Sequence, residues 1–430
     1  MKAPAPAPLS ADTAFRELAP LVWLALGTFA TGTESFMIAA LLPGLSADLA
    51  VSVTAAGQLM TVFALTYALS SPVLAAATAG IERRKLLLAA MAAFALANFV
   101  AASAATYWQL MAARVLLAAA AGLYVPSASG LAGAVVSPQR RGMALAIVMG
   151  GTSSAVALGV PLGAIIGHAL GWRATFVGVG ILAAVAIVGL ALGLPRGVGA
   201  RLATPTLRER IAVVRRPPVL VGLLITTLWA TGAYTAYTYL APYLVEVTGI
   251  APAQVGLVLL VWGLAAVMGI FGGGALTDRI GARAVIAPAL TLLALALATL
   301  SVGPHLLTGH ALLVVTLVAI TTWGVAGWGF SPSQQTRLLE IGGLGVAPIA
   351  LSLNASFMYL GFSLGAALGS LTLLLHGALT SLGLVGALCE LAALAVMWLA
   401  TSRSSARAGS TAPNAVPLQA VTCPQSAREV

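Results

Sequence analysis

Charged residues are scarce in this sequence. Only 7% of its 430 residues are Asp, Glu, Lys or Arg, whereas 60% are hydrophobic. A soluble domain typically carries about 25% charged residues, so this composition excludes a mostly soluble protein. The mean hydropathy of +1.02 leaves no room for a large soluble domain. The sequence therefore predicts a chain whose main solvent is lipid.

Residues that carry catalytic or metal chemistry are also few. Cys389 lies in an apolar run and Cys423 in a polar segment, and the two show neither a disulfide framework nor a metal-ligand spacing. The sequence has no Gly-x-x-x-x-Gly-Lys-Ser/Thr loop for ATP, no His-Glu-x-x-His motif, and no histidine beside a serine within an apolar run. We expect no metal, no cofactor and no enzymatic activity.

Apolar runs long enough to cross a bilayer recur along the chain. A helix needs about 20 apolar residues to span a hydrocarbon core of about 30 Å. The sequence predicts twelve such spans, at residues 21–42, 56–79, 86–105, 110–134, 143–166, 175–194, 219–240, 255–276, 284–302, 312–330, 349–375 and 379–400. They form bundles over 21–194 and 219–400. Residues 1–20 and the basic linker 195–218 lie outside the two bundles, and residues 401–430 are expected to form a disordered tail.

The net charge of +10 would indicate nucleic-acid binding in a soluble protein. Here the basic residues follow the predicted topology instead. If the N-terminus is cytoplasmic, all Lys and Arg fall in cytoplasmic segments except Arg173, which lies outside, and Arg114, which lies inside a span. This asymmetry is typical of the positive-inside rule. We expect a multi-pass protein of the inner membrane, with both termini cytoplasmic and no nucleic-acid partner.

The two halves of the chain repeat each other. Pro43 follows the first span and Gly57 opens the second, while Pro242 and Gly256 stand at the matching places of the second half, 199 residues later. One residue out of that register, Thr-Gly-Thr-Glu at 31–34 matches Thr-Gly-Ala-Tyr at 231–234. A parallel repeat of six spans is typical of a carrier made of two pseudo-symmetric six-helix bundles.

A polar loop separates the eighth and ninth spans. It reads Gly274-Ala-Leu-Thr-Asp278-Arg279-Ile-Gly281-Ala-Arg283 and resembles the loop signature of the major facilitator superfamily. The resemblance implies a cytoplasmic latch, in which Asp278 accepts hydrogen bonds from a helix N-terminus or an arginine. The alternative is a simple topogenic turn. The matching loop of the first half has Ala79 where the acid is expected, and Glu82 is the acid that could replace it.

The fifth span contains Gly159-Val160-Pro161-Leu162-Gly163. Small residues four apart line one helix face and permit close helix approach, and Pro161 removes a backbone hydrogen bond, so a hinge or a tight gate seam is expected. The segment resembles the antiporter motif of the 12-span drug:proton antiporter branch of the superfamily, which includes arabinose and nucleoside efflux permeases. This resemblance implies a carrier that functions as a monomer.

Two charged residues lie inside spans of the first half. Glu34 stands about 12 Å from the outer end of the first span, and Arg114 about 9 Å from the outer end of the fourth. Buried charges in a bilayer are costly, at roughly 2.5 to 3.5 kcal/mol, and usually face a cavity. We expect the two to meet and Glu34 to carry the transported proton. The alternative is a static ion pair.

Aromatic and polar side chains suggest the substrate cavity. The candidates are Phe36, Tyr234, Tyr237, Trp323 and Asn354, each of which could instead serve helix packing. Tyr239 and Tyr243 fit an interfacial belt better. The position matching Glu34 in the second half has no acid, so coupling is expected in the first half alone. Glu390, in the last span, is expected to face lipid or scaffold.

These observations favour secondary active export of a drug, a sugar or a nucleoside-like molecule by proton antiport and alternating access. The partners would be that substrate, protons and the bilayer. A proton-independent facilitator or uptake carrier is the main alternative. A polytopic membrane enzyme and a channel are weaker ones, because neither a buried nucleophile with its base nor a repeated polar ring is evident.

Overall fold

The computed structural model describes residues 11–195, 197, 205–343 and 346–410, and all regular structure in these ranges is helical. Twelve helical segments are long and apolar enough to cross a membrane, as predicted. Those of the first half are α1 (Ala11–Asp48), α2 (Val53–Ala77), α3 (Arg83–Ala102), α4 (Tyr107–Ala132), the run α5 (Arg141–Ser154), η2 (Ala155–Gly159) and α6 (Val160–Leu170), and α7 (Trp172–Gly193).

The second half repeats this order. Its spans are α9 (Pro217–Tyr237) with α10 (Leu240–Glu246), α11 (Val255–Ile280), α12 (Ala282–Leu306), α13 (Gly309–Gly342), α14 (Ala347–His376) and α15 (Ser381–Ser410). Three short helices connect spans: η1 (Pro138–Arg140), α8 (Leu207–Val214) and η3 (Pro252–Gln254).

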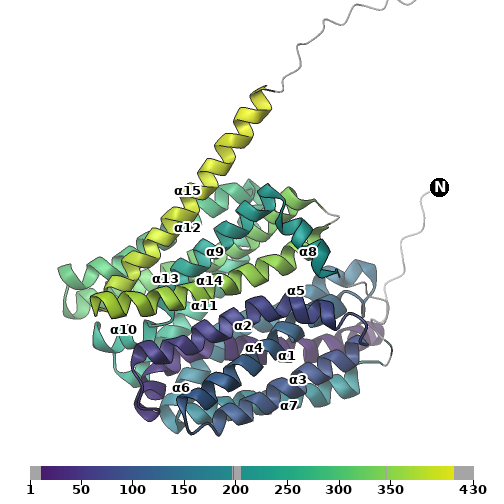
Figure 1. Cartoon of the computed structure of the whole chain (residues 1–430), viewed down its shortest axis with the longest axis horizontal. Helices are drawn as coiled ribbons and strands as arrows, with labels where there is room; N and C mark the ends of the chain where they lie inside the picture. The colour runs from purple at the N-terminus through teal and green to yellow at the C-terminus, as the bar shows by residue number, and fades with distance from the viewer. Residues whose placement is uncertain (1–10, 196, 198–204, 344–345, 411–430) are drawn as a thin grey trace, which may run out of the picture.

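The spans pack as two bundles, α1 to α7 and α9 to α15, which lie one above the other in Figure 1. We call the end of the molecule that carries α8 the linker face and the other end the opposite face. The bundles meet along two seams. At one, α2 packs against α14, and at the other, α11 packs against η2 and α6.

Glycine sets the closest helix contacts. A Cβ atom at Gly273 of α11 would lie 2.7 Å from the Gly329 Cα of α13, so the two helices touch through their backbones. Such contacts replace the hydrophobic driving force that a lipid solvent does not supply.

Two segments outside the bundles differ from the expectation. The linker contains α8, which begins with a capping box between Thr206 and Glu209, and which contacts both α2 and α14. At the other end of the chain, α15 continues past Ala400 to Ser410, into the segment expected to lack regular structure. That expectation remains for residues 411–430, which lie outside the described residues, as do Arg196 and Arg201 of the linker.

Candidate functional site

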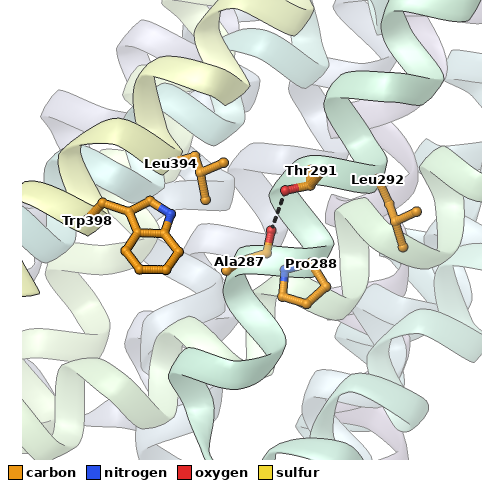
Figure 2. A pocket seen from close by; sticks show the side chains of 6 residues that line it. All are labelled: Ala287, Pro288, Thr291, Leu292, Leu394 and Trp398. Carbon is orange, nitrogen blue, oxygen red and sulfur yellow. Dashed lines mark hydrogen bonds between the residues drawn. The ribbon is translucent and has the colours of Figure 1, made fainter.

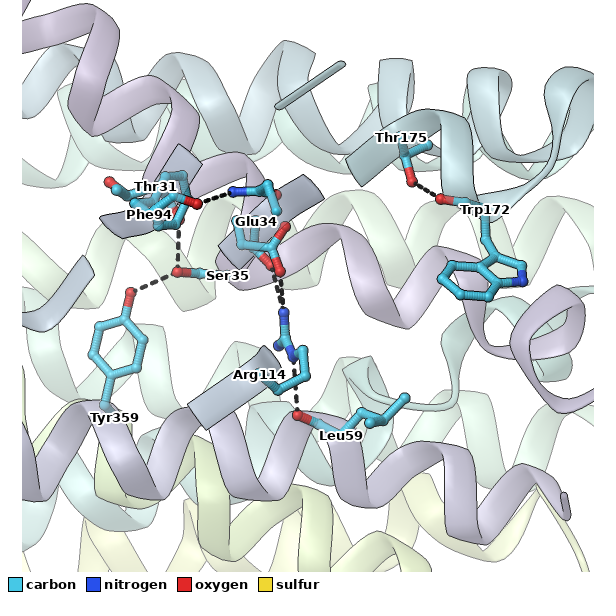
Figure 3. Close-up of polar contacts among 10 residues, drawn as sticks. Thr31, Glu34, Ser35, Leu59, Phe94, Arg114, Trp172, Thr175 and Tyr359 are labelled. Carbon is cyan, nitrogen blue, oxygen red and sulfur yellow. Dashed lines mark hydrogen bonds and ion pairs between the residues drawn. The ribbon is translucent and has the colours of Figure 1, made fainter. Parts of the chain in front are cut away.

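Glu34 and Arg114 form an ion pair between α1 and α4, as the depth comparison predicted. Both side chains are 0% exposed. The Arg114 Nη1 atom donates to the Glu34 carboxylate and, at 3.3 Å, to the Glu34 backbone carbonyl, while Nε donates to the Leu59 carbonyl at 3.3 Å. Figure 3 shows the guanidinium between these partners. Its carbon also lies 4.1 Å from the centre of the Phe63 ring.

The pair leaves hydrogen-bonding capacity unused. Glu34 Oε2 and Arg114 Nη2 are buried without a hydrogen-bond partner among the described residues. A buried ion pair is stable only when its remaining atoms are also satisfied, so this one is a poor structural device. The free oxygen and the free N–H are instead available to a proton or to a substrate group.

The antiporter motif packs directly against α1 beside Glu34. A Cβ atom at Gly159 would overlap the Thr33 hydroxyl, and one at Gly163 would lie 3.2 Å from the Met37 Cβ. The helix forms a π-turn over Ala155–Gly159, immediately before Pro161. Wide turns of this kind occur mostly at functional positions. The predicted close approach is therefore present, and it lies at the level of the ion pair.

The same motif also borders the other bundle. A Cβ atom at Gly256 of α11 would lie 2.7 Å from Ile165 Cγ1 and 3.4 Å from the Pro161 carbonyl. Gly263 lies equally close to the backbone of Val156 and Ala157. Movement of η2 therefore affects both the ion-pair helix α1 and the seam with α11.

Two hydrogen bonds cross between the bundles next to Glu34. The Tyr359 hydroxyl of α14 donates to Ser35 Oγ at 3.2 Å, and the Tyr237 hydroxyl of α9 donates to the Phe36 carbonyl at 3.1 Å. Further along α14 toward the opposite face, Ser363 and Ser370 donate to the Thr61 and Thr54 carbonyls of α2 at 2.9 and 3.5 Å. These bonds close the bundles from the centre to the opposite face.

Aromatic rings fill the centre between the bundles. We call this group the aromatic box; Phe36 packs on it, and it is lined by Trp229, Ala233, Tyr234, Tyr237, Trp262, Trp323, Gly327, Trp328 and Phe362. The cavity that they enclose has a volume of about 10 Å³. Ligand pockets of about 300 to 1,000 Å³ are usual, so these rings must separate before a substrate fits.

Four of the five predicted cavity residues belong to this centre, and Asn354 does not. Its Oδ1 accepts from Thr226 Oγ1 at 2.7 Å, and Gln334 Nε2 donates to the same Thr226 oxygen at 3.1 Å. Asn354 lies two helical turns from Phe362 toward the linker face, which takes it out of the box. There it joins α9, α13 and α14 into one polar cluster.

Several members of the centre were not predicted. Trp229, Trp262, Trp328 and Phe362 give no signal beyond an aromatic residue in an apolar run. Tyr239 was expected at the membrane interface, but it is fully buried, and its hydroxyl fills the space above Gly57 across the seam. Tyr243 is also buried and donates to the Leu300 carbonyl at 2.7 Å. The interfacial interpretation is therefore wrong for both.

The latch residues are not engaged in this conformation. Asp278, Arg279, Gly281 and Arg283 are exposed on the linker face, and Asp278 has no ion pair or side-chain hydrogen bond within the described residues. Gly274 lies nearby, 3.9 Å from Pro332 of its own bundle when a Cβ is added.

The first-half copy of this loop holds the linker instead. Arg84 Nη2 and Nε donate to the Ala191 and Leu194 carbonyls at the end of α7, at 2.6 and 2.9 Å. Glu82 Oε1 accepts from the Gly197 backbone N–H at 3.0 Å, which holds the pKa of this carboxyl below its usual value. In this conformation Glu82 therefore holds the linker and forms no latch.

Another hollow lies between α12 and α15 (Figure 2). It has a volume of about 510 Å³ and is lined by Ala287, Pro288, Thr291, Leu292, Leu394 and Trp398. The hydroxyl of Thr291 is bonded to the Ala287 carbonyl at 2.9 Å, and Trp398 is 61% exposed. This hollow opens on the outer surface of the spans and has no charged lining, so we do not assign it to the site.

The fold and the site together agree with one family. The model of the Major Facilitator Superfamily matches residues 24–342, which is more than half of the chain. The chain belongs to the major facilitator superfamily. It is thus a multi-pass membrane protein of a transporter family, with the six-plus-six architecture of that superfamily.

Two solved structures share the fold. The nucleoside transporter NupG covers 89% of this chain at a TM-score of 0.70 and 11% identity, with 99% of its own chain covered. The human organic anion transporter MFSD10 matches 90% of this chain and 100% of its own, with a TM-score of 0.65 and 17% identity.

Proteins named as transporters or as a resistance protein are similar in sequence. The MFS-type transporter YbcL of Bacillus subtilis is 35% identical over 85% of this chain and 91% of its own length. A chloramphenicol resistance protein of Streptomyces lividans is 35% identical over 66% of this chain and 74% of its own length. A probable sugar efflux transporter of Helicobacter acinonychis is 33% identical over 57% of this chain and 62% of its own length.

Proposed function

We propose that this superfamily member exports a small molecule in exchange for protons, with Glu34 as the proton carrier. The observation that carries the proposal is the fully buried Glu34–Arg114 pair, whose Glu34 Oε2 has no partner. Ionisable residues inside a membrane span are costly, and those that occur there usually have a function. Glu34 lies one and two residues from Ser35 and Phe36, which accept the bonds that join the bundles.

The proton acts through the charge of Glu34. When Glu34 is ionised, it attracts Arg114 and holds α1 against α4. When it is protonated, this attraction is lost, and the guanidinium keeps only the Leu59 and Glu34 carbonyls and the Phe63 ring. Because Ser35 and Phe36 follow on the same helix, a shift of α1 reaches the Tyr359 and Tyr237 hydroxyls and so the seam.

The aromatic box is the substrate site in this proposal. Tyr234, Trp229 and Trp262 have buried polar atoms without partners, and a substrate with oxygen acceptors would pair with them. Rings and hydroxyls suit amphipathic drugs, sugars and nucleoside-like molecules. The names of the relatives, chloramphenicol resistance protein and sugar efflux transporter, support an export direction for such compounds.

The distribution of basic residues supports a cytoplasmic linker face, with both termini on that side. The described conformation is then closed toward the outside. Export requires the opposite arrangement as well, in which the seam bonds break and the latch residues of α11 engage.

The test compares Glu34→Gln with wild type. Cells that overproduce each protein are exposed to a panel of toxic compounds that includes chloramphenicol, and protected compounds are then measured in inverted vesicles with an imposed pH gradient. We expect wild type to accumulate them and Glu34→Gln to be produced at the same level without gradient-driven accumulation. Glu246→Gln, which changes an exposed acid at the end of α10, is the control and should behave as wild type.

Two results would contradict the proposal. Gradient-driven accumulation by Glu34→Gln would exclude Glu34 as the carrier of the proton. Accumulation by wild type that ignores the gradient would show a facilitator, which moves its substrate without protons.

A further inference from the structure

A second acid is completely buried in the spans. Glu390 of α15 is 0% exposed, and neither of its carboxyl oxygens has a hydrogen-bond partner among the described residues. Of the two expected surroundings, lipid or scaffold, the carboxyl has the second, since it is enclosed by protein. It points into the bundle, toward α9.

The carboxyl occupies a notch in α9. A Cβ atom at Gly232 would lie 2.5 Å from Glu390 Oε1, and one at Gly386 would lie 2.7 Å from the Gly232 carbonyl. The two helices therefore touch through their backbones at this point, and Glu390 Oε1 is placed against the Gly232 backbone. One oxygen also approaches the Ala233 amide, without the geometry of a hydrogen bond.

The location of the notch connects Glu390 with Glu34. Residues 231–234 of α9 are the repeat of residues 31–34 of α1, and Tyr234 stands where Glu34 stands in the first half. The acid that α9 lacks at this level is thus supplied from α15. Among the described residues, each bundle then has one buried carboxyl at this level: Glu34 on the first helix itself, and Glu390 packed against the first helix from α15.

The surroundings provide no counter-charge. On α9 the titratable groups are Tyr234, which stacks on Phe362, and Tyr237, which bonds to Phe36, so both point to the aromatic box. On α12 they are Arg283 and His305, near its two ends. On α14 they are Tyr359, which bonds to Ser35 of the other bundle, and His376, its last residue. Cys389 is the titratable neighbour on α15 itself. A carboxylate here would be unpaired, which favours a bound proton in this conformation.

Helix α9 is the wall between this carboxyl and the aromatic box, because Ala233 lines the box on its other side. This part of α9 is less stable than a regular helix. Thr231 and Thr235 each donate to the carbonyl four residues earlier at 2.8 Å, a bond that slightly destabilises and bends helices. The helix then ends at Tyr237, before α10. A change of charge behind α9 would therefore alter the lining of the box.

We propose that Glu390 is a second proton-binding residue of this carrier, which releases its proton when α9 repacks against α15. The proposal rests on the proton antiport proposed above. It places one exchangeable proton in each bundle, at Glu34 and at Glu390.

The experiment uses the whole protein in lipid nanodiscs and requires no substrate. Infrared difference spectra in D₂O are recorded from about pH 5 to about pH 10, a range that brackets the titration of perturbed carboxyls. We expect a protonated-carboxyl band that is present in wild type and in Glu34→Gln, is absent from Glu390→Gln, and decreases at least tenfold across the range. In wild type, amide hydrogen exchange of α9 should increase as the band is lost. The increase should exceed the intrinsic effect of pH on exchange, which is measured in Glu390→Gln.

Other results would overturn the inference. A Glu390 band that keeps its intensity at every pH would show a permanently neutral, structural acid, and a band that is missing at every pH would show a carboxylate. Both measurements can be made on wild type and Glu34→Gln alone if Glu390→Gln does not fold. If Glu34→Gln abolishes gradient-driven export while the Glu390 band never changes, proton antiport stands and the second proton site fails. If Glu34→Gln exports normally, the assignment of the transported proton to Glu34 fails, and if wild-type export ignores the gradient, proton antiport itself fails.

Discussion

The Tyr359 hydroxyl donates to Ser35 Oγ at 3.2 Å and thereby joins the two bundles one residue away from Glu34. The Tyr359 ring also stacks on Tyr67 of α2, with ring centres 3.6 Å apart. The contact thus has two parts, a polar bond to α1 and an apolar stack on α2, and these can be separated by mutation.

Tyr359→Phe removes the bond and keeps the stack. A hydrogen bond of this kind contributes about 1 kcal/mol, so we expect a roughly fivefold decrease in the closed conformation relative to the open one. The measurement is the cross-linking rate between cysteines placed at Thr54 and Ser370, which lie across the seam, with Cys389 and Cys423 replaced. Tyr107→Phe is the matched control, because its hydroxyl bonds to Ala55 within one bundle. Equal cross-linking in both variants would contradict the prediction.

Gly159→Ala tests the contact between the antiporter motif and α1. The new methyl group would overlap the Thr33 hydroxyl, so we expect a loss of about 1 to 3 kcal/mol in stability and a loss of export. Thermal unfolding and vesicle accumulation are the measurements. Adding Thr33→Ala should restore part of both. Gly150→Ala, where a methyl group meets nothing within 4 Å, should leave both unchanged. Export by Gly159→Ala at the wild-type rate would exclude a role for this packing.

Asp278→Asn tests the latch. Asp278 is exposed and unpaired in this conformation, so the change should alter stability by no more than about 0.5 kcal/mol. Export should nevertheless fall, because the latch forms only when the linker face closes. Thr277→Val provides the contrast, since Thr277 bonds to Ser333 within the same bundle at 2.6 Å and its loss should lower the thermal stability. A loop that serves only topology would leave export by Asp278→Asn at the wild-type level.

Glu82→Gln tests the anchor of the linker and its pH dependence. The Gly197 N–H, followed by Lys85 and Arg84, holds the pKa of Glu82 below its usual value. A depressed pKa stabilises the fold above the unfolded-state value of about 4.3, and this stabilisation is lost as the pH falls through the folded-state pKa. Wild type should therefore melt at a higher temperature than Glu82→Gln at neutral pH, and the two should converge in acid. A difference that persists below about pH 3 would contradict the electrostatic explanation.

Much of the architecture could be predicted from the sequence, because apolar runs of bilayer length leave few alternatives to a helix. The meeting of Glu34 and Arg114 could also be predicted, since both positions can be counted from the ends of their spans. Tyr239 could not be placed in the same way. An aromatic residue near a span end looks the same whether it anchors the membrane interface or fills the space above a glycine such as Gly57 in another bundle.

The contact of Glu390 with α9 could not be predicted for a related reason. Its side chain meets Gly232, a residue without a side chain, so neither a charge pattern nor a polar partner in the sequence indicates the contact. The π-turn over Ala155–Gly159 is also invisible to a small-residue pattern, which is satisfied equally by a regular helix. In the contacts of Tyr239 and Glu390, one partner is a glycine and offers no side chain to read from the sequence.

The replacement of the latch acid by Ala79 gives the two bundles unequal roles at the linker face. Glu82 and Arg84 fix the α2–α3 loop to α7 and to the start of the linker, so the first bundle moves there as one rigid body with the connection it carries. Only the α11–α12 loop remains to lock the closed state on this side. We expect a shallow free-energy minimum and a short dwell time for the state that is closed at the linker face. In the absence of substrate, most molecules should then be open to the cytoplasm.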